Sequence, residues 1–492
     1  MKEYPSSKEL ALLLLTAVLA IVVHGYHPGV EDAEIYLPGI HKALNPQLYP
    51  QNAAFFASHA RLTLFPNLIA ASVRVTHLPL GWAVFLWHLF SIFLVLLGAW
   101  HIGRLVFRTS IAQWGGVALL ASLLTIPVAG TALYIMDEYL TTRSLSTPAV
   151  LFIVINVVER KFLRAFLWTL FTALIHPLMI VFGLAYGGLL FWMDRRQPLT
   201  FDRQKTAAVA VALLLPFGFF PPATDAYREV LNSRPYFFLL RWQWYEWVGI
   251  FAPLIMLWWF RALARRQGLT LLERMCTALV IFELAFFLIA LAITVPARFL
   301  SFVELQPMRS LHLLYIVFFV FLGGLLAQHI LKHQVWRWLM LFLPLCAGMA
   351  YAQRQTFPAS SHLELPGTAP RNAWVEAFLW VRDKTPVDAY FGLDPHFMAL
   401  PGEDQHGFRA IAERSRLADS IKDSGAVSMF PALAGTWKEQ VEALQSWDNF
   451  QLVDFQRLHQ RFGVDWVVVQ RPAPVNLSCP YQNHSLAVCR LQ

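Results

Sequence analysis

The sequence predicts a polytopic α-helical membrane protein with a C-terminal α/β domain outside the membrane. Hydrophobic residues make up 57% of its 492 residues and charged residues only 14%, and the mean hydropathy is +0.49. An average soluble protein is about half apolar and a quarter charged. Apolar runs fill residues 1–352, and a polar stretch follows from Gln353. We therefore divide the chain into a membrane domain, 1–352, with a first outer loop at 25–79, and an outer domain, 353–492.

The apolar runs predict about eleven membrane spans, since a spanning helix needs roughly 20 apolar residues. The run at Phe166–Met193 is too long for one helix, and we divide it at His176-Pro177 because proline kinks or breaks helices. The runs are Leu10–His24, Leu80–Ile102, Gly115–Ile135, Ser146–Val158, Phe166–Met193, Ala207–Phe220, Val248–Phe260, Met275–Val295, Met308–Leu331 and Val335–Tyr351.

The basic residues predict the orientation of these spans, because short cytoplasmic loops collect Lys and Arg. With the N-terminus inside, such clusters as Lys2 and Lys8, Arg104 and Arg108, and Arg160–Arg164 fall on the cytoplasmic side. An odd number of spans then places the outer domain outside the cytoplasm, and we expect this side to be the periplasm at a bacterial inner membrane. The formal net charge of +8 is therefore a topology signal. No basic stripe with interleaved aromatic residues is present, so we expect no nucleic-acid partner.

The outer domain reads as a small α/β unit. Asn372–Asp383, Trp437–Gln445 and Asn449–Phe462 have helical patterns, and Gly463–Val469 reads as a buried, β-branched strand after a glycine break. Cys479 and Cys489 flank a short stretch with a turn at its centre, which predicts a disulfide in an oxidising compartment.

An acidic cluster follows the first span. Glu31, Asp32 and Glu34 lie within four residues, and ionised carboxylates are costly in hydrocarbon. The cluster must therefore lie at a water interface or in a polar cavity. An alternative is that these acids only solvate or cap the first turn of a loop helix. We expect Glu34 to be the solvated member.

Several short motifs resemble those of the GT-C superfamily of membrane glycosyltransferases. They are Glu31-Asp32 in the first loop, Asp137-Glu138-Tyr139-Leu140 with Thr142-Arg143, His176-Pro177, and the outer-domain phrases Lys384-Thr385-Pro386 and Phe462-Gly463-Val464-Asp465-Trp466, which look like those of bacterial members. The resemblance implies transfer of a sugar from a polyprenyl-phosphate or polyprenyl-diphosphate carrier to an extracytoplasmic glycan, lipid or protein. The tail lacks a WWDYG-like motif, so donor and acceptor stay open.

The chemistry that this resemblance implies assigns roles to particular residues. Asp32, supported by Glu31, would take the acceptor proton as general base or bind a metal. Arginines would meet the charge of the leaving phosphate, and snorkelling at helix ends is their alternative role. The candidates for the phosphate are Arg143, Arg309, Arg298, His176, Arg241 and Arg234.

A divalent metal, Mg²⁺ or Mn²⁺, is the one cofactor that these residues could bind, and otherwise we expect none. Asp32, Asp137 and Glu138 would be its oxygen ligands, with His24, His27, His41 and His59 as further candidates near the acidic cluster. The aromatic run Tyr236–Trp247 reads as an interfacial belt or as a wall for the lipid carrier. Two alternatives remain for the whole chain: a non-catalytic envelope-assembly protein with this fold, and a secondary transporter.

Overall fold

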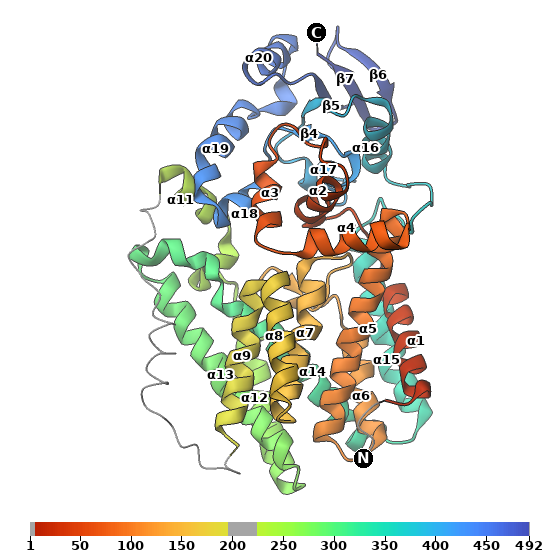
Figure 1. The fold of residues 1–492 in the computed structure, drawn as a ribbon, viewed down its shortest axis with the longest axis vertical. Coiled ribbons are helices and arrows are strands. Elements are labelled where there is room, and N and C mark those ends of the chain that lie inside the picture. Colours follow the sequence, from red (N-terminus) through yellow and green to blue (C-terminus); the bar gives the residue numbers. More distant parts are fainter. Residues whose placement is uncertain (1–4, 195–223, 492) are drawn as a thin grey trace.

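A computed structural model describes residues 5–194 and 224–491 of the chain, apart from the side chains of Ala297 and Arg298. Figure 1 shows two layers: a helical bundle below, and above it the outer domain, with helices of the first loop between them. The protein is a multi-pass membrane protein by the length and composition of its helices. Six helical stretches are long and apolar enough to cross a membrane: Ser7–His24 (α1), Leu80–Val106 (α5), Trp244–Arg266 (α12), Thr270–Thr294 (α13), Phe299–Leu331 (containing α14, Ser310–Leu326) and Val335–Thr356 (α15).

Four shorter apolar helices complete the described part of the bundle: Ser110–Ala121 (α6), Thr142–Val158 (α7), Phe162–Ile175 (α8) and Pro177–Trp192 (α9). The predicted break at His176-Pro177 is confirmed, because α8 ends before His176 and α9 begins at Pro177. The predicted span at Ala207–Phe220 lies outside the described residues, and the structure therefore does not establish a count of eleven.

The predicted span Gly115–Ile135 is wrong in its second half. Helix α6 ends at Ala121, and Pro127–Val128 (β1) pairs with Leu133–Tyr134 (β2) in a short hairpin. Gly130 in the turn has a φ of 61°, and a Cβ there would lie 2.2 Å from the Trp242 ring, so the close approach requires glycine. The hairpin forms part of the wall of the central cavity described below.

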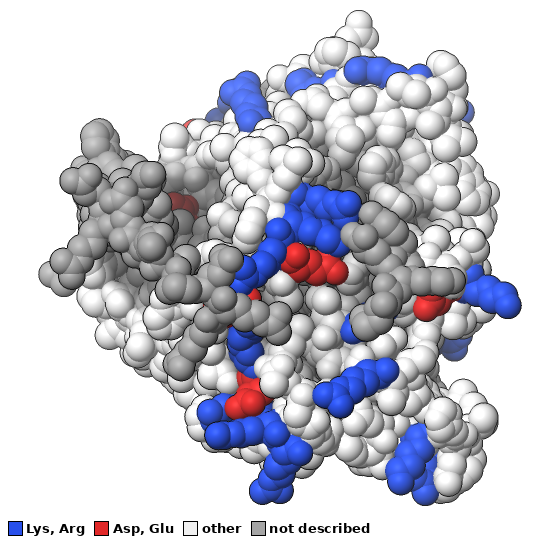
Figure 2. Space-filling model, turned by 60° about the horizontal axis from the view of Figure 1, so that its bottom comes forward, with Lys and Arg blue, Asp and Glu red and all other residues white. Residues whose placement is uncertain are grey.

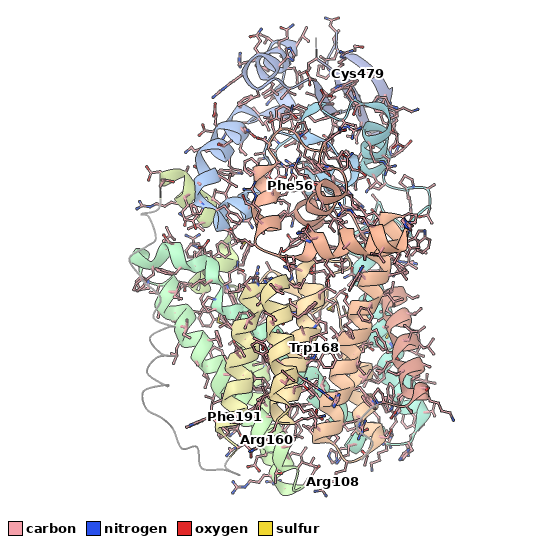
Figure 3. The ribbon with its side chains drawn as sticks, viewed as in Figure 1. Phe56, Arg108, Arg160, Trp168, Phe191 and Cys479 are labelled. Carbon is pink, nitrogen blue, oxygen red and sulfur yellow. A yellow bond between two sulfur atoms is a disulfide. The ribbon has the colours of Figure 1, made fainter. Side chains whose placement is uncertain are left out.

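The end of the bundle opposite the outer domain is rich in basic side chains. Figure 2 shows Lys and Arg spread over this face, and Figure 3 places Arg108 and Arg160 at this end, with Cys479 at the far end of the outer domain. This distribution is the one expected when basic loops face the cytoplasm.

The first loop forms three helices: Ala33–Leu44 (α2), Ala54–Arg61 (α3) and Phe65–Thr76 (α4). Helix α2 packs on Phe408–Ala412 (α17) of the outer domain, and α3 packs on Asp423–Met429 (α18). Phe55 is buried in a shared apolar cluster with Val427 and Trp437 of the outer domain. The first loop therefore packs against the outer domain and shares its apolar core.

The outer domain is built on a five-stranded sheet. Its strands are Tyr390–Gly392 (β3), Ser415–Arg416 (β4), Trp466–Gln470 (β5), Ser478–Gln482 (β6) and Leu486–Arg490 (β7). Their order in the sheet is β4-β3-β5-β7-β6. Strands β4, β3 and β5 are parallel, and β5, β7 and β6 are antiparallel. Cys479 and Cys489 form the disulfide between β6 and β7.

Helices cover this sheet, and they agree with the helical patterns predicted for the outer domain. They are Ala373–Lys384 (α16), Phe408–Ala412 (α17), Asp423–Met429 (α18), Ala434–Ala443 (α19) and Leu452–Phe462 (α20), while Asp225–Asn232 (α11) of the membrane domain packs on α18 and α19. Helix α15 runs to Thr356, so it crosses the predicted domain boundary after residue 352.

Candidate active site

A cavity of about 920 Å³ lies where the bundle, the first loop and the outer domain meet. Its size is in the range of sites that enclose a small organic ligand. All three parts of the chain contribute ionisable side chains to its wall. These are Glu31, Asp32 and His59 from the loop, Asp137, Arg143, His176, Arg234, Glu246, Glu304 and Arg309 from the membrane domain, and Lys422 from the outer domain.

Asp32 lies at the N-cap of α2, where its backbone N–H donates to the hydroxyl of Tyr139 at 3.1 Å. Its side chain is 30% exposed, and it lies between two cations: Oδ1 accepts from Lys422 Nζ at 3.1 Å, and Oδ2 is 3.4 Å from Arg143 Nη1. Burial alone would raise the pKa of Asp32, but Lys422 and Arg143 outweigh it and hold that pKa well below its ordinary value. Asp32 is therefore an ionised carboxylate that faces the cavity.

Arg143 is fixed at the start of α7. The capping box of Thr141 and Ser144 defines that helix end, and Thr141 Oγ1 also donates to Asp137 Oδ2 at 3.1 Å. Asp137 in turn accepts from Arg143 Nη2 at 2.9 Å. The guanidinium is only 8% exposed, and it bridges Asp137 and Asp32. The structure thus brings together two acidic motifs that are far apart in the sequence.

Lys422 lines the cavity and was not predicted from the sequence. It lies 390 positions from Asp32 in the chain, in the turn before α18, and no motif marks it. Its Nζ contacts both Glu31 and Asp32, and it is 12% exposed. Nothing in the sequence indicates that this turn lies against the first loop.

Arg309 differs from Lys422 and Arg143, and it shares with Arg234 the lack of a carboxylate partner among the described residues. Lys422 and Arg143 contact carboxylates, whereas Arg309 forms no ion pair with any residue that the structure describes, and its Nε is buried without a hydrogen-bond partner. Arg309 is partly exposed and lines the cavity. A guanidinium without a carboxylate partner is a candidate to bind an anionic ligand.

Two further predicted residues line the same cavity. His176 lies at the junction of α8 and α9. Arg234 binds the outer domain through Nη2, which donates to the carbonyl of Ile421 and to Ser424 Oγ, both at 2.7 Å. Arg234 thus connects the membrane domain to the turn that carries Lys422.

Arg241 lies outside the cavity, contrary to the role predicted for it. Its guanidinium is exposed and donates to the carbonyl and side-chain oxygens of Asn232 at 3.0 and 2.9 Å. The guanidinium also stacks over the ring of Phe238. The interfacial alternative therefore describes Arg241 better. The side chain of Arg298 lies outside the described residues.

The structure does not bring together, as one set of ligands, the residues that were predicted to bind Mg²⁺ or Mn²⁺. Arg143 separates Asp32 from Asp137 and binds both, and Glu138 does not line the cavity. Three of the four nearby histidines have partners outside the cavity: His24 contacts Thr125, His27 contacts Glu364 and His41 contacts Tyr49. Of these four, only His59 lines the cavity. Within residues 5–194 and 224–491, no group of three or more His, Cys, Asp or Glu is placed to hold a metal ion.

The prediction for Glu34 is wrong, because its side chain is completely buried instead of solvated. Its Oε1 accepts from Arg416 Nη2 at 2.8 Å and lies 3.5 Å from Arg409 Nη1. Arg409 and Arg416 also bind Asp423, at 2.7 and 3.2 Å. Sequence spacing placed Glu34 next to Asp32, but helix α2 turns the two side chains to different surroundings: Asp32 faces the cavity, and Glu34 faces the outer domain.

Comparison with known proteins adds little to this geometry. No protein-family model and no curated protein matches the sequence. Among solved structures, the chain is similar to the archaeal oligosaccharyltransferase AglB from Archaeoglobus fulgidus, in complex with an inhibitory peptide and a dolichol-phosphate, at 12% identity and a TM-score of 0.40, over 94% of this chain and 69% of that one. A likeness of this size does not establish a shared fold. Any functional proposal therefore rests on the arrangement of Asp32, Arg143, Lys422 and Arg309 around one cavity.

Proposed function

We propose that the protein is a membrane glycosyltransferase that moves a sugar from a polyprenyl-phosphate or polyprenyl-diphosphate carrier to a hydroxyl of an extracytoplasmic glycan, lipid or protein. One observation carries this proposal: an ionised carboxylate, Asp32, and a guanidinium without an anion, Arg309, line the same cavity at the boundary of the bundle. Transfer from a phosphate carrier needs a proton acceptor and a cation that meets the leaving phosphate.

The proposed step uses these groups as follows. The acceptor hydroxyl gives its proton to Asp32, and its oxygen forms a bond to the anomeric carbon of the sugar. The bond between that carbon and the phosphate oxygen breaks, and the electron pair leaves on the phosphate. Arg309 meets the resulting charge, because guanidinium binds phosphate with a two-pronged geometry. Arg143 holds the carboxylate of Asp32 in place.

The apolar part of the cavity supports a lipid carrier. Beside the charged groups, its wall includes aliphatic and aromatic side chains from the loop, the β1–β2 hairpin and the helix junction. A cavity with both kinds of wall suits a phosphate that is attached to a hydrocarbon chain. The apolar residues are Ile35, Leu62, Val128, Leu133, Ile175, Leu178, Phe237 and Leu305.

The orientation belongs to the same proposal. Arg108 and Arg160 lie at the end of the bundle away from the outer domain (Figure 3), as expected for a cytoplasmic face. The cavity and the outer domain would then face the periplasm of a bacterial inner membrane. Cysteine labelling of intact cells at an exposed outer-domain position tests this orientation, and labelling only after lysis would contradict it.

The activity is tested with purified protein in liposomes that contain a labelled polyprenyl-phosphate sugar and an extract of envelope acceptors. We expect release of free polyprenyl phosphate and transfer of the label, both measured by mass spectrometry. The exposed Asp225, which lines no part of the cavity, provides the control variant Asp225→Asn. Equal release by wild type and Asp32→Asn would refute the mechanism, and coupled ion flux without release would favour transport.

A further inference from the structure

We propose that Lys422 does the work of a divalent metal ion in this site: its ammonium group positions Glu31 and Asp32, so transfer needs no metal. The inference rests on the glycosyl transfer proposed above. Lys422 Nζ contacts Glu31 and lies 3.1 Å from Asp32 Oδ1. A compact cation that two carboxylates share is the arrangement in which Mg²⁺ or Mn²⁺ would otherwise be expected.

Charge explains why a metal ion cannot join this arrangement. A divalent cation bound to Asp32 Oδ1 would lie within a few ångströms of Lys422 Nζ, and like charges at such distances repel strongly in a partly buried site. The other oxygen of Asp32 faces Arg143, which also holds Asp137. Both sides of the Asp32 carboxylate are therefore occupied by side-chain cations.

The turn that carries Lys422 is held in place by the outer domain itself and by the first loop. Asp419 Oδ1 accepts from the backbone N–H groups of Ile421, Lys422 and Asp423 at 2.8, 2.6 and 3.0 Å. Arg416 binds Asp419 and, at 2.8 Å, Glu34 of the first loop. The same loop that supplies Glu31 and Asp32 therefore also anchors the turn that delivers Lys422 to them.

Arg234 of the membrane domain holds the turn from the other side. Its bonds to the carbonyl of Ile421 and to Ser424 Oγ are both 2.7 Å long. Contacts from two separate parts of the chain thus fix the backbone on both sides of Lys422. Such support is typical of a functional side chain that must keep one position.

The test compares three variants at position 422 with a matched control. Lys438, in α19, forms an exposed pair with Glu229, and Lys438→Met controls for loss of a lysine in the same domain. Transfer is measured with excess EDTA. We expect full wild-type activity in EDTA, a loss of about 100-fold or more in Lys422→Met and Lys422→Gln, as for removal of one fixed charge-stabilising donor, and retention of most activity in Lys422→Arg.

A readout other than activity separates this inference from the proposed function. Mn²⁺ binding to wild type and Asp32→Asn is followed by electron paramagnetic resonance, and bound metal in the purified protein by elemental analysis. We expect no Mn²⁺ bound in an Asp32-dependent manner. Two results would overturn the role of Lys422 and leave glycosyl transfer intact. One is a single equivalent of Mn²⁺ bound by wild type and not by Asp32→Asn, and the other is an activity that EDTA removes and Mg²⁺ restores.

The position-422 variants also decide between positioning and folding. Loss of activity in Lys422→Met with recovery in Lys422→Arg supports a positioning role, whereas equal loss in both, with an equal fall in Tm, would show a merely structural role. If wild type transfers no sugar, the proposed function fails, and the Mn²⁺ measurement still tests whether Lys422 excludes a metal.

Discussion

Two groups of charges join the first loop to the outer domain, and they differ in how deeply their carboxylates are buried. In the closed cluster, Glu34, Arg409, Arg416, Asp419 and Asp423 are all buried and bind one another. In the open cluster, Glu31, Asp32, Arg143 and Lys422 face a cavity of about 920 Å³. Buried charges are stable only when they are fully paired. The closed cluster therefore holds the two parts together, and the open one remains available to a substrate.

Within the open cluster, substitutions of Asp32 and Glu31 should differ most in their effect on turnover. Asp32→Asn should lower turnover by about 10³-fold or more, because it removes the proton acceptor. Glu31 is 34% exposed and contacts only Lys422, so Glu31→Gln should cost about 10-fold. Release of polyprenyl phosphate is the measurement. Equal losses in the two variants would mean that the pair acts as a unit and that Asp32 is not the single base.

The closed cluster should respond in stability. Arg416→Gln leaves Glu34, Asp419 and Asp423 with only Arg409 to match them, and breaking a buried ion pair costs about 3–5 kcal/mol. The exposed pair of Arg461 with Glu439 supplies the control Arg461→Gln, which should cost less than about 1 kcal/mol. Thermal unfolding in detergent measures both. A small effect of Arg416→Gln would show that this ion pair contributes little to holding the loop and the outer domain together.

A third group of contacts, between Glu364 and two histidines, predicts that the stability of the fold depends on pH. Glu364 lies 3.1 Å from His27 and 3.2 Å from His406. Burial raises the pKa of Glu364, but its bonds to the two histidines outweigh this and lower the pKa to about 2, from 4.5. A lowered carboxylate pKa stabilises the fold above the unfolded value, and this stability disappears as pH falls from about 4.5 to about 2.

The variant Glu364→Gln should therefore lose up to about 3 kcal/mol at neutral pH, and its Tm should change less between pH 5 and pH 3 than that of wild type. His406 works in the opposite sense. Burial lowers its pKa, but Glu364 raises it overall, so its contribution is present at acidic pH and is lost as pH rises through the raised pKa. Glu442→Gln, at an exposed position, is the control. If Tm changed with pH in parallel for wild type and Glu364→Gln, the contacts of Glu364 would not be the source of the pH dependence.

Arg309 provides the smallest expected effect and the clearest contrast with Arg416. Since Arg309 has no ion-pair partner in the described part of the chain, Arg309→Gln should leave stability unchanged or slightly raised, while it weakens binding of the carrier by about 10-fold or more. Arg241→Gln, outside the cavity, should change neither quantity. Titration with polyprenyl phosphate gives the affinity. A stability loss in Arg309→Gln without weaker binding would identify Arg309 as structural.

Much of the fold follows from local sequence patterns. Apolar runs mark the long helices because hydrocarbon requires them, and His176-Pro177 marks a helix break because proline lacks a backbone donor. The same reasoning failed at Gly115–Ile135. The second half of that run forms a hairpin instead of a helix. An apolar run alone does not distinguish a strand from a helix, and the turn of this hairpin packs against Trp242, a residue far away in the sequence.

By itself, the sequence determined that this is a multi-pass membrane protein with a mixed α/β domain, and that Asp32 and Arg143 are candidates for the site. Only the tertiary structure decided which charges meet. It buried Glu34, kept Arg241 out of the cavity, and brought Lys422 across 390 positions to Asp32. The reason is physical: helix and strand patterns are local, whereas the pairing of charges depends on how distant segments pack, which no local pattern records.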